Sequence, residues 1–372
     1  MKTGFLKIVR RNRITLVLLL LSGLLLFCAR TVNGFAEWYA THIYTFLVNL
    51  CGGFFGFFPF SVSELLLYLL LLTAVVSLLC SLKKGPRALL HWLRHLMCAA
   101  SVLLLLFVLN CGINYYRSSF SQKTGITAAA YSSQELEELC LWLTEEINAR
   151  ASQVSRDADD RMLLPSENAG QLAVEAMHRL GELYPDLQGY YPRPKPVLFS
   201  KILSLEGLTG IYSAFTIEAN YNRDMTAYNI PFTMCHELSH LRGFMQEEEA
   251  NFIAFLACEN AAQTEFQYSG YLTAWIHATN ALYRADRTAW QEVRALLCEE
   301  AQIDLNANNQ YWAMHDGLIS EVSDAVNDTY LKANGQSEGI KSYGRMVDLL
   351  LTYWMEKQQN GFLYEASVPS SP

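Results

Sequence analysis

Three long apolar runs in the first third of the chain constrain its fold more than any other feature. They cover residues 14–29, 61–82 and 96–113 of a chain of 372 residues. A helix of about 20 apolar residues crosses a bilayer core of roughly 30 Å, and a water-soluble domain has no need of such runs. The first run is short, but Arg13 and Arg30 flank it and can extend to the polar interfaces. The sequence therefore predicts three transmembrane helices.

The segment between the first two runs, residues 35–60, holds ten aromatic residues and Pro59. Aromatic rings favour the membrane–water interface, so we expect this segment to lie along the bilayer surface; the alternative is a fourth span. Two basic clusters bear on this choice: Lys2, Lys7, Arg10, Arg11 and Arg13 before the first run, and Lys83, Lys84, Arg87 and Arg94 between the last two. Three spans keep both clusters on the cytoplasmic side, whereas four would move the second outside, against the positive-inside rule. We therefore expect three uncleaved spans, a cytoplasmic N-terminus, and everything after residue 113 outside.

The charge of the chain divides at residue 117. Residues 1–117 hold 11 Lys or Arg and two acidic residues, which leaves 17 basic and 34 acidic residues for the remainder. We therefore predict a membrane region (1–117) and an outer domain (118–372). An acidic domain lacks the basic surface that phosphate groups require, which excludes nucleic acid as a partner. The nine cysteines form no CxxC pair, and we expect mostly free thiols, with a disulfide in the outer domain as the alternative.

The outer domain is predicted to be α+β and mostly helical. Apolar residues recur at helical spacing in residues 132–156 and 169–184, and from Pro231 almost to the end of the chain. Residues 196–203 and 211–222 are predicted strands. In the second, apolar and polar residues alternate from Phe215 to Asn222, which indicates one buried and one polar face. These strands predict a small sheet beside the helices.

The motif HExxH, formed by His236, Glu237 and His240, carries the chemistry of this sequence. On a helix, residues four apart project from one face about a turn apart, so both imidazoles can bind one ion. This spacing suits zinc, and Glu237 is placed to take a proton from a water at the metal. Pro231 suits the first turn of such a helix, and Gly243 suits a left-handed cap at its end. We therefore predict a Zn²⁺ site with Glu237 as the catalytic residue; a structural or inactive zinc site is the alternative.

A catalytic zinc site requires a third protein ligand and one open position. The next helix begins with Glu247, Glu248 and Glu249, and Asn251 follows one residue later. This segment resembles the E-x-x-A-D/N pattern of thermolysin-like and membrane-anchored zincins. The resemblance implies that Glu247 is the third ligand and that Asn251 holds a ligand histidine from behind. Glu249, about 200° round the helix from Glu247, is the alternative ligand; a metzincin-like third histidine is disfavoured because residue 246 is Gln.

Zincins commonly bind a peptide along an edge strand just before the metal-binding helix. The predicted strand 211–222 has that place in the sequence, which implies that Glu218 and Asn220 face the substrate. The alternative is that both are solvated strand residues. Three later residues, His315, Tyr343 and Arg345, are candidates for stabilising the negative charge that develops on the substrate oxygen.

The whole chain resembles the domain-of-unknown-function 3810 family of bacterial membrane proteins. The likeness rests on FPFSVSELLL (58–67), GINYYR (112–117), FTIEANYN (215–222), CHELSHLRGFMQEEEANFIAFLAC (235–258) and YLKANGQSEGIKSYGRMVDLLL (330–351). It implies three N-terminal spans followed by a zincin-like, gluzincin-type domain outside the bacterial cytoplasmic membrane. We therefore expect a membrane-anchored zinc metallopeptidase that acts on extracytoplasmic peptides or proteins. The alternative is an inactive, zinc-braced membrane protein for binding or assembly.

Overall fold

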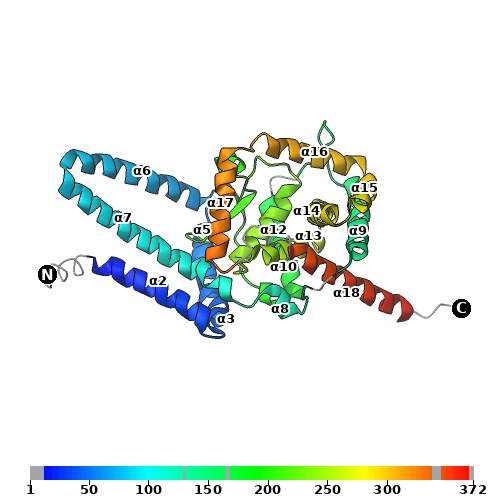
Figure 1. The fold of residues 1–372 in the computed structure, drawn as a ribbon, viewed down its shortest axis with the longest axis horizontal. Helices are drawn as coiled ribbons and strands as arrows, with labels where there is room; N and C mark the ends of the chain where they lie inside the picture. Colours follow the sequence, from blue (N-terminus) through cyan, green and yellow to red (C-terminus); the bar gives the residue numbers. More distant parts are fainter. Residues whose placement is uncertain (1–11, 129–130, 165–167, 337–344, 368–372) are drawn as a thin grey trace.

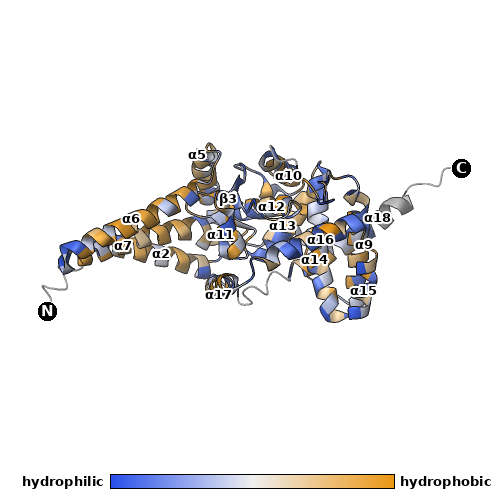
Figure 2. Ribbon diagram, turned by 90° about the horizontal axis from the view of Figure 1, so that it is seen from above, coloured by the Kyte–Doolittle hydropathy of each residue, from blue (hydrophilic) through white to orange (hydrophobic). Residues whose placement is uncertain are grey.

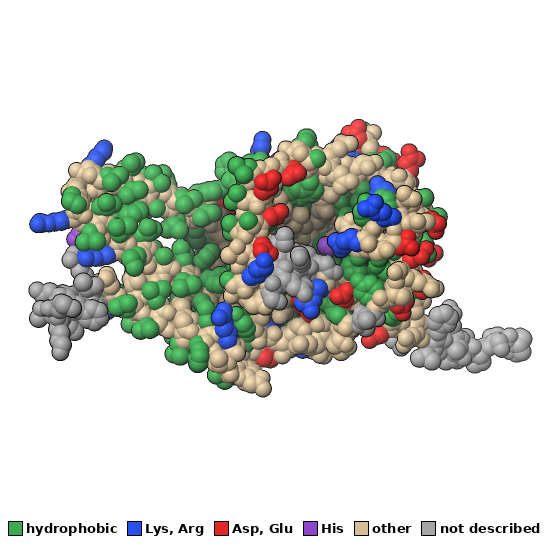
Figure 3. All heavy atoms as spheres, in the orientation of Figure 1, with side chains coloured by type: hydrophobic (Ala, Val, Ile, Leu, Met, Phe, Trp, Pro, Cys, Tyr) green, Lys and Arg blue, Asp and Glu red, His purple; other side chains and the backbone are tan. Residues whose placement is uncertain are grey.

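The computed structural model describes residues 12–128, 131–164, 168–336 and 345–367, with residues 360–367 described by their backbone alone. A bundle of three long helices extends from one side of a mostly helical domain, and the two termini lie at opposite ends of the molecule (Figure 1). Apolar side chains cover the bundle, whereas most acidic side chains in the same view lie on the domain (Figure 3). This division matches the predicted contrast between an apolar region and an acidic one.

The bundle consists of α2 (Arg13–Thr31), α6 (Val62–Lys84) and α7 (Pro86–Phe107). A π-helical turn, η3 (Val108–Gly112), prolongs α7 toward Tyr116. Within the described residues, three helices are long and apolar enough to cross a membrane, which confirms the predicted number. The third helix starts ten residues earlier than predicted, at Pro86 rather than residue 96. A turn at Gly85 is enough to reverse the chain, so basic residues that suggested a long loop form the first turns of α7.

The aromatic segment forms one helical run made of α3 (Phe35–Trp38), η1 (Tyr39–Tyr44), α4 (Thr45–Leu47), η2 (Val48–Gly52) and α5 (Gly53–Gly56). We call this run the aromatic helix. Tyr44 and Val48 are buried in the domain, and the Tyr44 hydroxyl donates to the Leu241 carbonyl at 2.9 Å. Phe54 and Phe57 on its outer side are exposed. Among the described residues, this run is not one of the helices long and apolar enough to cross a membrane, and its place along the bilayer surface stays a prediction.

The domain is built from helices on either side of the candidate site. The helices before the site are α8 (Phe120–Thr124), α9 (Ser133–Ala151), α10 (Ala169–Leu183) and α11 (Ser200–Leu205). After it come α12 (Asn229–Leu241), α13 (Glu247–Glu259), α14 (Thr264–Ala285), α15 (Arg287–Ala295), α16 (Glu299–Ala313), α17 (Leu318–Ala333) and α18 (Met346–Ser367). Ser132 caps α9 by exchanging hydrogen bonds with Glu135. The predicted helices 132–156 and 169–184 are confirmed as α9 and α10.

The small sheet differs from the prediction in register and order. Its strands are β1 (Lys195–Pro196), β2 (Gly210–Ser213) and β3 (Glu218–Tyr221), in the order β1-β3-β2. The predicted strand 196–203 is wrong beyond Pro196, because α11 occupies most of it. The predicted strand 211–222 is a hairpin, in which Ser213 pairs with Glu218 and residues 214–217 turn the chain. β3 is therefore the central strand and β2 an edge, and both faces of β3 are buried.

One hydrophobic core joins the membrane region to the outer domain. Tyr44, Val48, Val108 and Ile113 belong to the same buried cluster as Leu238 of α12. The predicted boundary at residue 117 therefore does not separate two cores. All nine cysteines are free thiols, and the three at 140, 235 and 258 are buried, in agreement with the prediction.

Candidate metal centre

The helix α12 carries the HExxH motif between the predicted end signals. Pro231 lies in its first turn, and Gly243 after its last turn has φ +92°, a left-handed conformation that favours glycine. The Gly243 amide donates to the His240 carbonyl at 2.8 Å, and the Phe244 amide donates to Ser239 at 3.2 Å. These bonds close the helix and reverse the chain. The reversal places the start of α13, at Glu247, beside the last turn of α12.

The side chains of His236, His240 and Glu247 converge. One nitrogen or oxygen atom from each lies within 4.8 Å of the other two. The Glu247 Oε2 atom is 3.3 Å from His236 Nε2 and 3.6 Å from His240 Nε2. The two imidazole rings are nearly perpendicular, with centroids 4.6 Å apart. Two imidazole nitrogens and a carboxylate oxygen around one point form a donor set that could hold a metal ion.

A backbone carbonyl orients the second histidine. His240 Nδ1 lies 2.9 Å from the Phe244 carbonyl oxygen, so this nitrogen carries a proton and Nε2 faces the cluster. The prediction that Asn251 supports a ligand histidine is not borne out. Asn251 is buried, but among the described residues His236 Nδ1 has no hydrogen-bond partner and His240 Nδ1 pairs with Phe244, so Asn251 holds neither ring. The tight turn at Gly243 brings the Phe244 carbonyl beneath His240 before α13 begins, so the local chain supplies the support.

The alternative ligand Glu249 points away from the cluster. Its carboxylate accepts hydrogen bonds from the amide and the hydroxyl of Ser121, in α8. It thereby ties α13 to the segment that leaves the membrane region. The expected angle of about 200° between Glu247 and Glu249 explains their different roles. Within the described residues, Glu247 is the carboxylate that meets both histidines.

The neighbouring acid, Glu237, is nearly enclosed, with 4% of its surface exposed. Its Oε2 atom has no hydrogen-bond partner among the described residues. Burial raises the pKa of Glu237 to about 7, although the two histidines and the Tyr212 amide oppose the rise. A Cβ atom added to Gly210 would lie 2.5 Å from Glu237 Oε1, so β2 passes directly over this carboxylate. Sequence reasoning had assigned Gly210 no role.

The charges of the cluster depend on one another. Burial lowers the pKa of His240, but the adjacent Glu247 carboxylate outweighs burial and raises it to about 9. Burial likewise opposes ionisation of Glu247, but His240 and His236 hold the pKa of its carboxyl well below the usual range. A further histidine of α14 lies close by: burial and His236 lower the pKa of His277 to about 4. No motif in the sequence around His277 predicts this position.

The residues predicted to face the substrate are structural. Glu218 and Asn220 are buried, on the central strand. Glu218 forms an ion pair with Lys195 and accepts hydrogen bonds from the amides of Val62 and Ser63, where α6 begins. The Asn220 side chain donates to the Ile211 carbonyl at 3.3 Å. The prediction that both face a cleft is therefore wrong, because β2 covers one edge of β3 and β1 the other.

The late candidates lie in different places. His315 follows α16, with Nδ1 2.9 Å from the Tyr311 carbonyl oxygen. Arg345 is exposed and lies 3.9 Å from Glu248, the neighbour of the convergent carboxylate. Tyr343 lies outside the described residues. Their predicted role at the substrate oxygen remains a prediction.

The fold and the centre define a class of protein: a mostly helical protein with three apolar helices, suited to a membrane, and a buried His–His–Glu cluster that could hold a metal ion. Within this class, the chain belongs to the family described as protein of unknown function (DUF3810), which matches residues 39–351. The match runs from the aromatic helix through the cluster to α18, and it confirms the predicted family. No curated protein and no solved structure matches the chain.

Proposed function

We propose that this protein is a membrane-anchored zinc metallopeptidase. The convergence of His236, His240 and Glu247 beside the enclosed carboxylate of Glu237 is the observation that carries the proposal. A ligand set of two histidines and one carboxylate is typical of catalytic rather than structural zinc sites. The Phe244 carbonyl behind His240 supplies the outer support that such ligands usually have.

The residues divide the chemistry among them. Bound zinc would supply a Lewis acid that polarises the scissile carbonyl and makes a water molecule more acidic. Glu237, with an oxygen free of hydrogen bonds, takes a proton from the attacking water and then delivers it to the leaving nitrogen. His236, His240 and Glu247 hold the ion at one fixed point. The enclosed position of Glu237 keeps its proton exchange with bulk water low.

The edge strand β2 is the proposed binding surface for an extended peptide. The strand β2 passes over Glu237 at Gly210, and within the described residues its outer edge pairs with no other strand. A peptide that pairs with this edge adds a strand through main-chain hydrogen bonds, with little dependence on its sequence. The peptide bond opposite Tyr212 then lies beside Glu237. The proposed binding strand is therefore β2, and not the neighbouring β3, which carries the predicted substrate-facing residues Glu218 and Asn220.

The proposed orientation places the domain outside the cytoplasmic membrane. The start of α2 and the turn between α6 and α7 lie at the end of the bundle remote from the domain (Figure 1). Lys83, Lys84 and Arg87 lie at that turn, and blue Lys and Arg side chains are visible at the same end in Figure 3. The positive-inside rule assigns this end to the cytoplasm.

Metal content and hydrolysis of the full-length protein in nanodiscs test the proposal. We expect near-stoichiometric zinc in the wild type and little zinc in His240→Ala. Glu237→Gln should keep its zinc and lose at least about 100-fold of its activity on a degenerate peptide library, because only the proton acceptor is removed. Wild-type activity in Glu237→Gln would contradict the proposal. Bound zinc without hydrolysis in any variant would instead favour the inactive, zinc-braced protein.

A further inference from the structure

The helix α17 turns an apolar stripe away from the domain. Leu318, Ile319, Val322 and Val326 are exposed, Val326 by 63%, and Leu331 is the one fully buried residue of the helix. At about 100° per residue, the apolar residues from 318 to 333 other than Leu331 cover an arc of about 140°. The centre of this arc is opposite Leu331. A surface helix of a water-soluble domain shows the reverse arrangement, with its apolar side inward.

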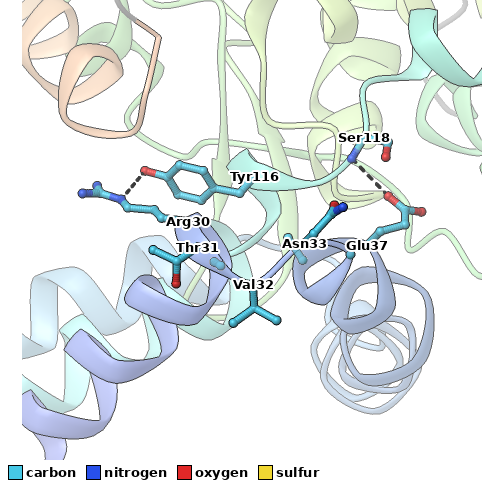
Figure 4. Close-up of a pocket in the computed structure, with 10 residues that line it drawn as sticks. Arg30, Thr31, Val32, Asn33, Glu37, Tyr116 and Ser118 are labelled. Atoms are coloured by element: carbon cyan, nitrogen blue, oxygen red, sulfur yellow. Dashed lines mark hydrogen bonds between the residues drawn. The ribbon is translucent and has the colours of Figure 1, made fainter.

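The position of α17 relates this stripe to the membrane. Its last residue, Ala333, accepts a hydrogen bond at 3.2 Å from Arg30, the basic residue at the domain end of α2. Arg30 also donates to the Tyr116 hydroxyl at 2.8 Å (Figure 4). The Tyr330 ring packs on Phe107 of α7, with centroids 6.0 Å apart. Figures 1 and 2 both place α17 beside the domain end of the bundle. The stripe therefore lies where the lipid-facing surface of the bundle ends.

The candidate metal centre lies at the same level. Met245, two residues before Glu247, has its sulfur 3.7 Å from the thiol of Cys111 in η3. The next residue, Gly112, approaches Leu26 of α2 so closely that an added Cβ would lie 3.3 Å from it. Leu26 is one helical turn before Arg30, within the apolar run. The loop before Glu247 thus contacts η3 through Met245, and η3 contacts α2 near the domain end of its apolar run.

Two tyrosines connect α17 to this contact. The Tyr330 hydroxyl lies 3.4 Å from the Cys111 thiol and accepts a hydrogen bond from Tyr115 at 3.1 Å. Cys111, Tyr115 and Met245 belong to one small buried cluster, separate from the main core. The outward stripe, the end of α7 and the loop before Glu247 therefore form one contiguous layer.

We propose that the apolar stripe of α17 lies in the outer surface of the bilayer, and that the centre therefore acts on polypeptide segments adjoining a membrane anchor. The substrate part of this inference rests on the proposed peptidase activity. We infer that a bilayer covers the stripe, because the stripe continues the apolar surface of the spanning helices. In addition, α17 runs across the direction of the bundle, and therefore along the plane of a bilayer that the bundle would cross (Figure 1). Amphipathic helices bind membranes in this way, with the apolar face buried at the headgroup boundary. A substrate that shares the bilayer then reaches β2 without leaving the membrane surface.

The aromatic helix provides independent support. It lies on the opposite side of the bundle from α17, also at the domain end, as the positions of α5 and α17 in Figure 2 show. Its Phe54 is 64% exposed, and Phe57, the residue directly after it, is 86% exposed. Aromatic side chains at this level are typical of a membrane–water interface. The two apolar surfaces would hold the domain against the bilayer from both sides.

Photocrosslinking tests where the stripe lies. The full-length protein is reconstituted in vesicles of phosphatidylethanolamine and phosphatidylglycerol, with a benzophenone amino acid at Val326 or, as a control, at Asp324 on the polar side of α17. We expect lipid adducts at least about tenfold more abundant from position 326, because the apolar face alone is buried in lipid. Equal lipid labelling at both positions would overturn the inference. Protein–protein adducts in place of lipid adducts at position 326 would also overturn it.

Two forms of one peptide library test the substrate class. The degenerate library is supplied with an acyl chain that anchors it in the same vesicles, or without one. We expect the anchored form to be cleaved at least about tenfold faster, because sharing a surface raises its effective concentration. The double variant Val322→Glu, Val326→Glu should lose this advantage and still cleave the free library, and Asp324→Asn should behave as wild type.

The outcomes separate the two proposals. Equal cleavage of both forms by the wild type would overturn the surface inference and leave the peptidase proposal intact. The same result follows if the double variant keeps its preference for the anchored form. Cleavage of neither form by the zinc-loaded wild type would overturn the peptidase proposal and the substrate class together, while the crosslinks would still decide where α17 lies.

Discussion

At the residue scale, three consecutive glutamates at the start of α13 have three different surroundings. Glu247 meets His236 and His240, Glu249 binds Ser121 of α8, and Glu248 lies near Arg345. Helix geometry alone points Glu247 and Glu249 in different directions, because side chains two residues apart on an α-helix differ by about 200° around its axis. The identity of the ligand therefore depends on where α13 begins.

We predict opposite effects for two substitutions of these glutamates. Glu247→Gln should weaken zinc binding by more than about 100-fold, since loss of an outer partner alone costs 10–100-fold. Glu249→Gln should keep near-stoichiometric zinc, and lose thermal stability instead, because it breaks the contact with α8. Zinc competition with a chelator and thermal unfolding of both variants measure the difference. Loss of zinc in Glu249→Gln alone would refute the assignment.

Local sequence was enough to predict the central residues of the site. His236, Glu237 and His240 follow from their spacing, and Glu247 from its resemblance to a zincin pattern. The Phe244 carbonyl behind His240 and the approach of Gly210 to Glu237 were not predictable in this way. A carbonyl has no sequence signature, and the Gly210 contact joins a strand to a helix. Glu218 was misassigned because a buried ion pair and a substrate contact both require a charged residue on a strand.

At the element scale, the contact between β2 and α12 sets the position of the Glu237 carboxylate, the proposed proton acceptor. In Gly210→Ala, the new Cβ would meet Glu237 Oε1 at 2.5 Å and Thr233 at 2.7 Å. Glu237 must then move, and a shift of about 1 Å can lower turnover by about 100-fold. We expect hydrolysis to fall while the zinc content stays unchanged. Gly53→Ala, where the added atom meets open space, is the control; normal turnover in Gly210→Ala would exclude this role.

The turn between α12 and α13 is held by an arginine from the end of the last span. The Arg117 guanidinium lies 4.1 Å from the centre of the Phe244 ring and donates to the Arg242 carbonyl at 3.1 Å. Phe244 in turn supports His240. Arg117→Met should therefore weaken zinc binding by about 10–100-fold although it removes no ligand. Chelator competition measures this, Arg179→Met on the exposed face of α10 is the control, and equal affinities would contradict it.

Helices were predictable from sequence and the sheet was not. The positions of α9, α10 and α12 follow from apolar periodicity and end signals such as Ser132 and Gly243, although α9 ends at Ala151, five residues earlier than predicted. The sequence predicts one strand where the structure has a hairpin, because Ile217 fits the alternation of apolar and polar residues. In the structure, Ile217 lies in the turn of the hairpin, with φ +54°. The alternation also failed to show that both faces of β3 are buried. A periodic pattern shows neither where a strand turns nor which strands pair with it.

At the scale of the whole molecule, the membrane region completes the core of the outer domain. Tyr44, Val48, Val108 and Ile113 are buried in the cluster that surrounds α12. We predict that a fragment of residues 118–372 does not fold, because it lacks these side chains and exposes the surface they cover. Near-ultraviolet circular dichroism and zinc content compare it with the full-length protein. A folded, zinc-binding fragment would contradict the shared core.

This shared core ties the maturation of the centre to the order of synthesis. The aromatic helix and η3 are translated before His236, so in the proposed orientation the surface that packs on α12 is delivered to the membrane first. A copy that fails to insert into the membrane lacks this packing surface, and nothing then holds α12 and α13 in the arrangement that brings His236, His240 and Glu247 together. The proposed peptidase would thus stay silent in the compartment where it is made, and would gain activity only where its anchor has been delivered.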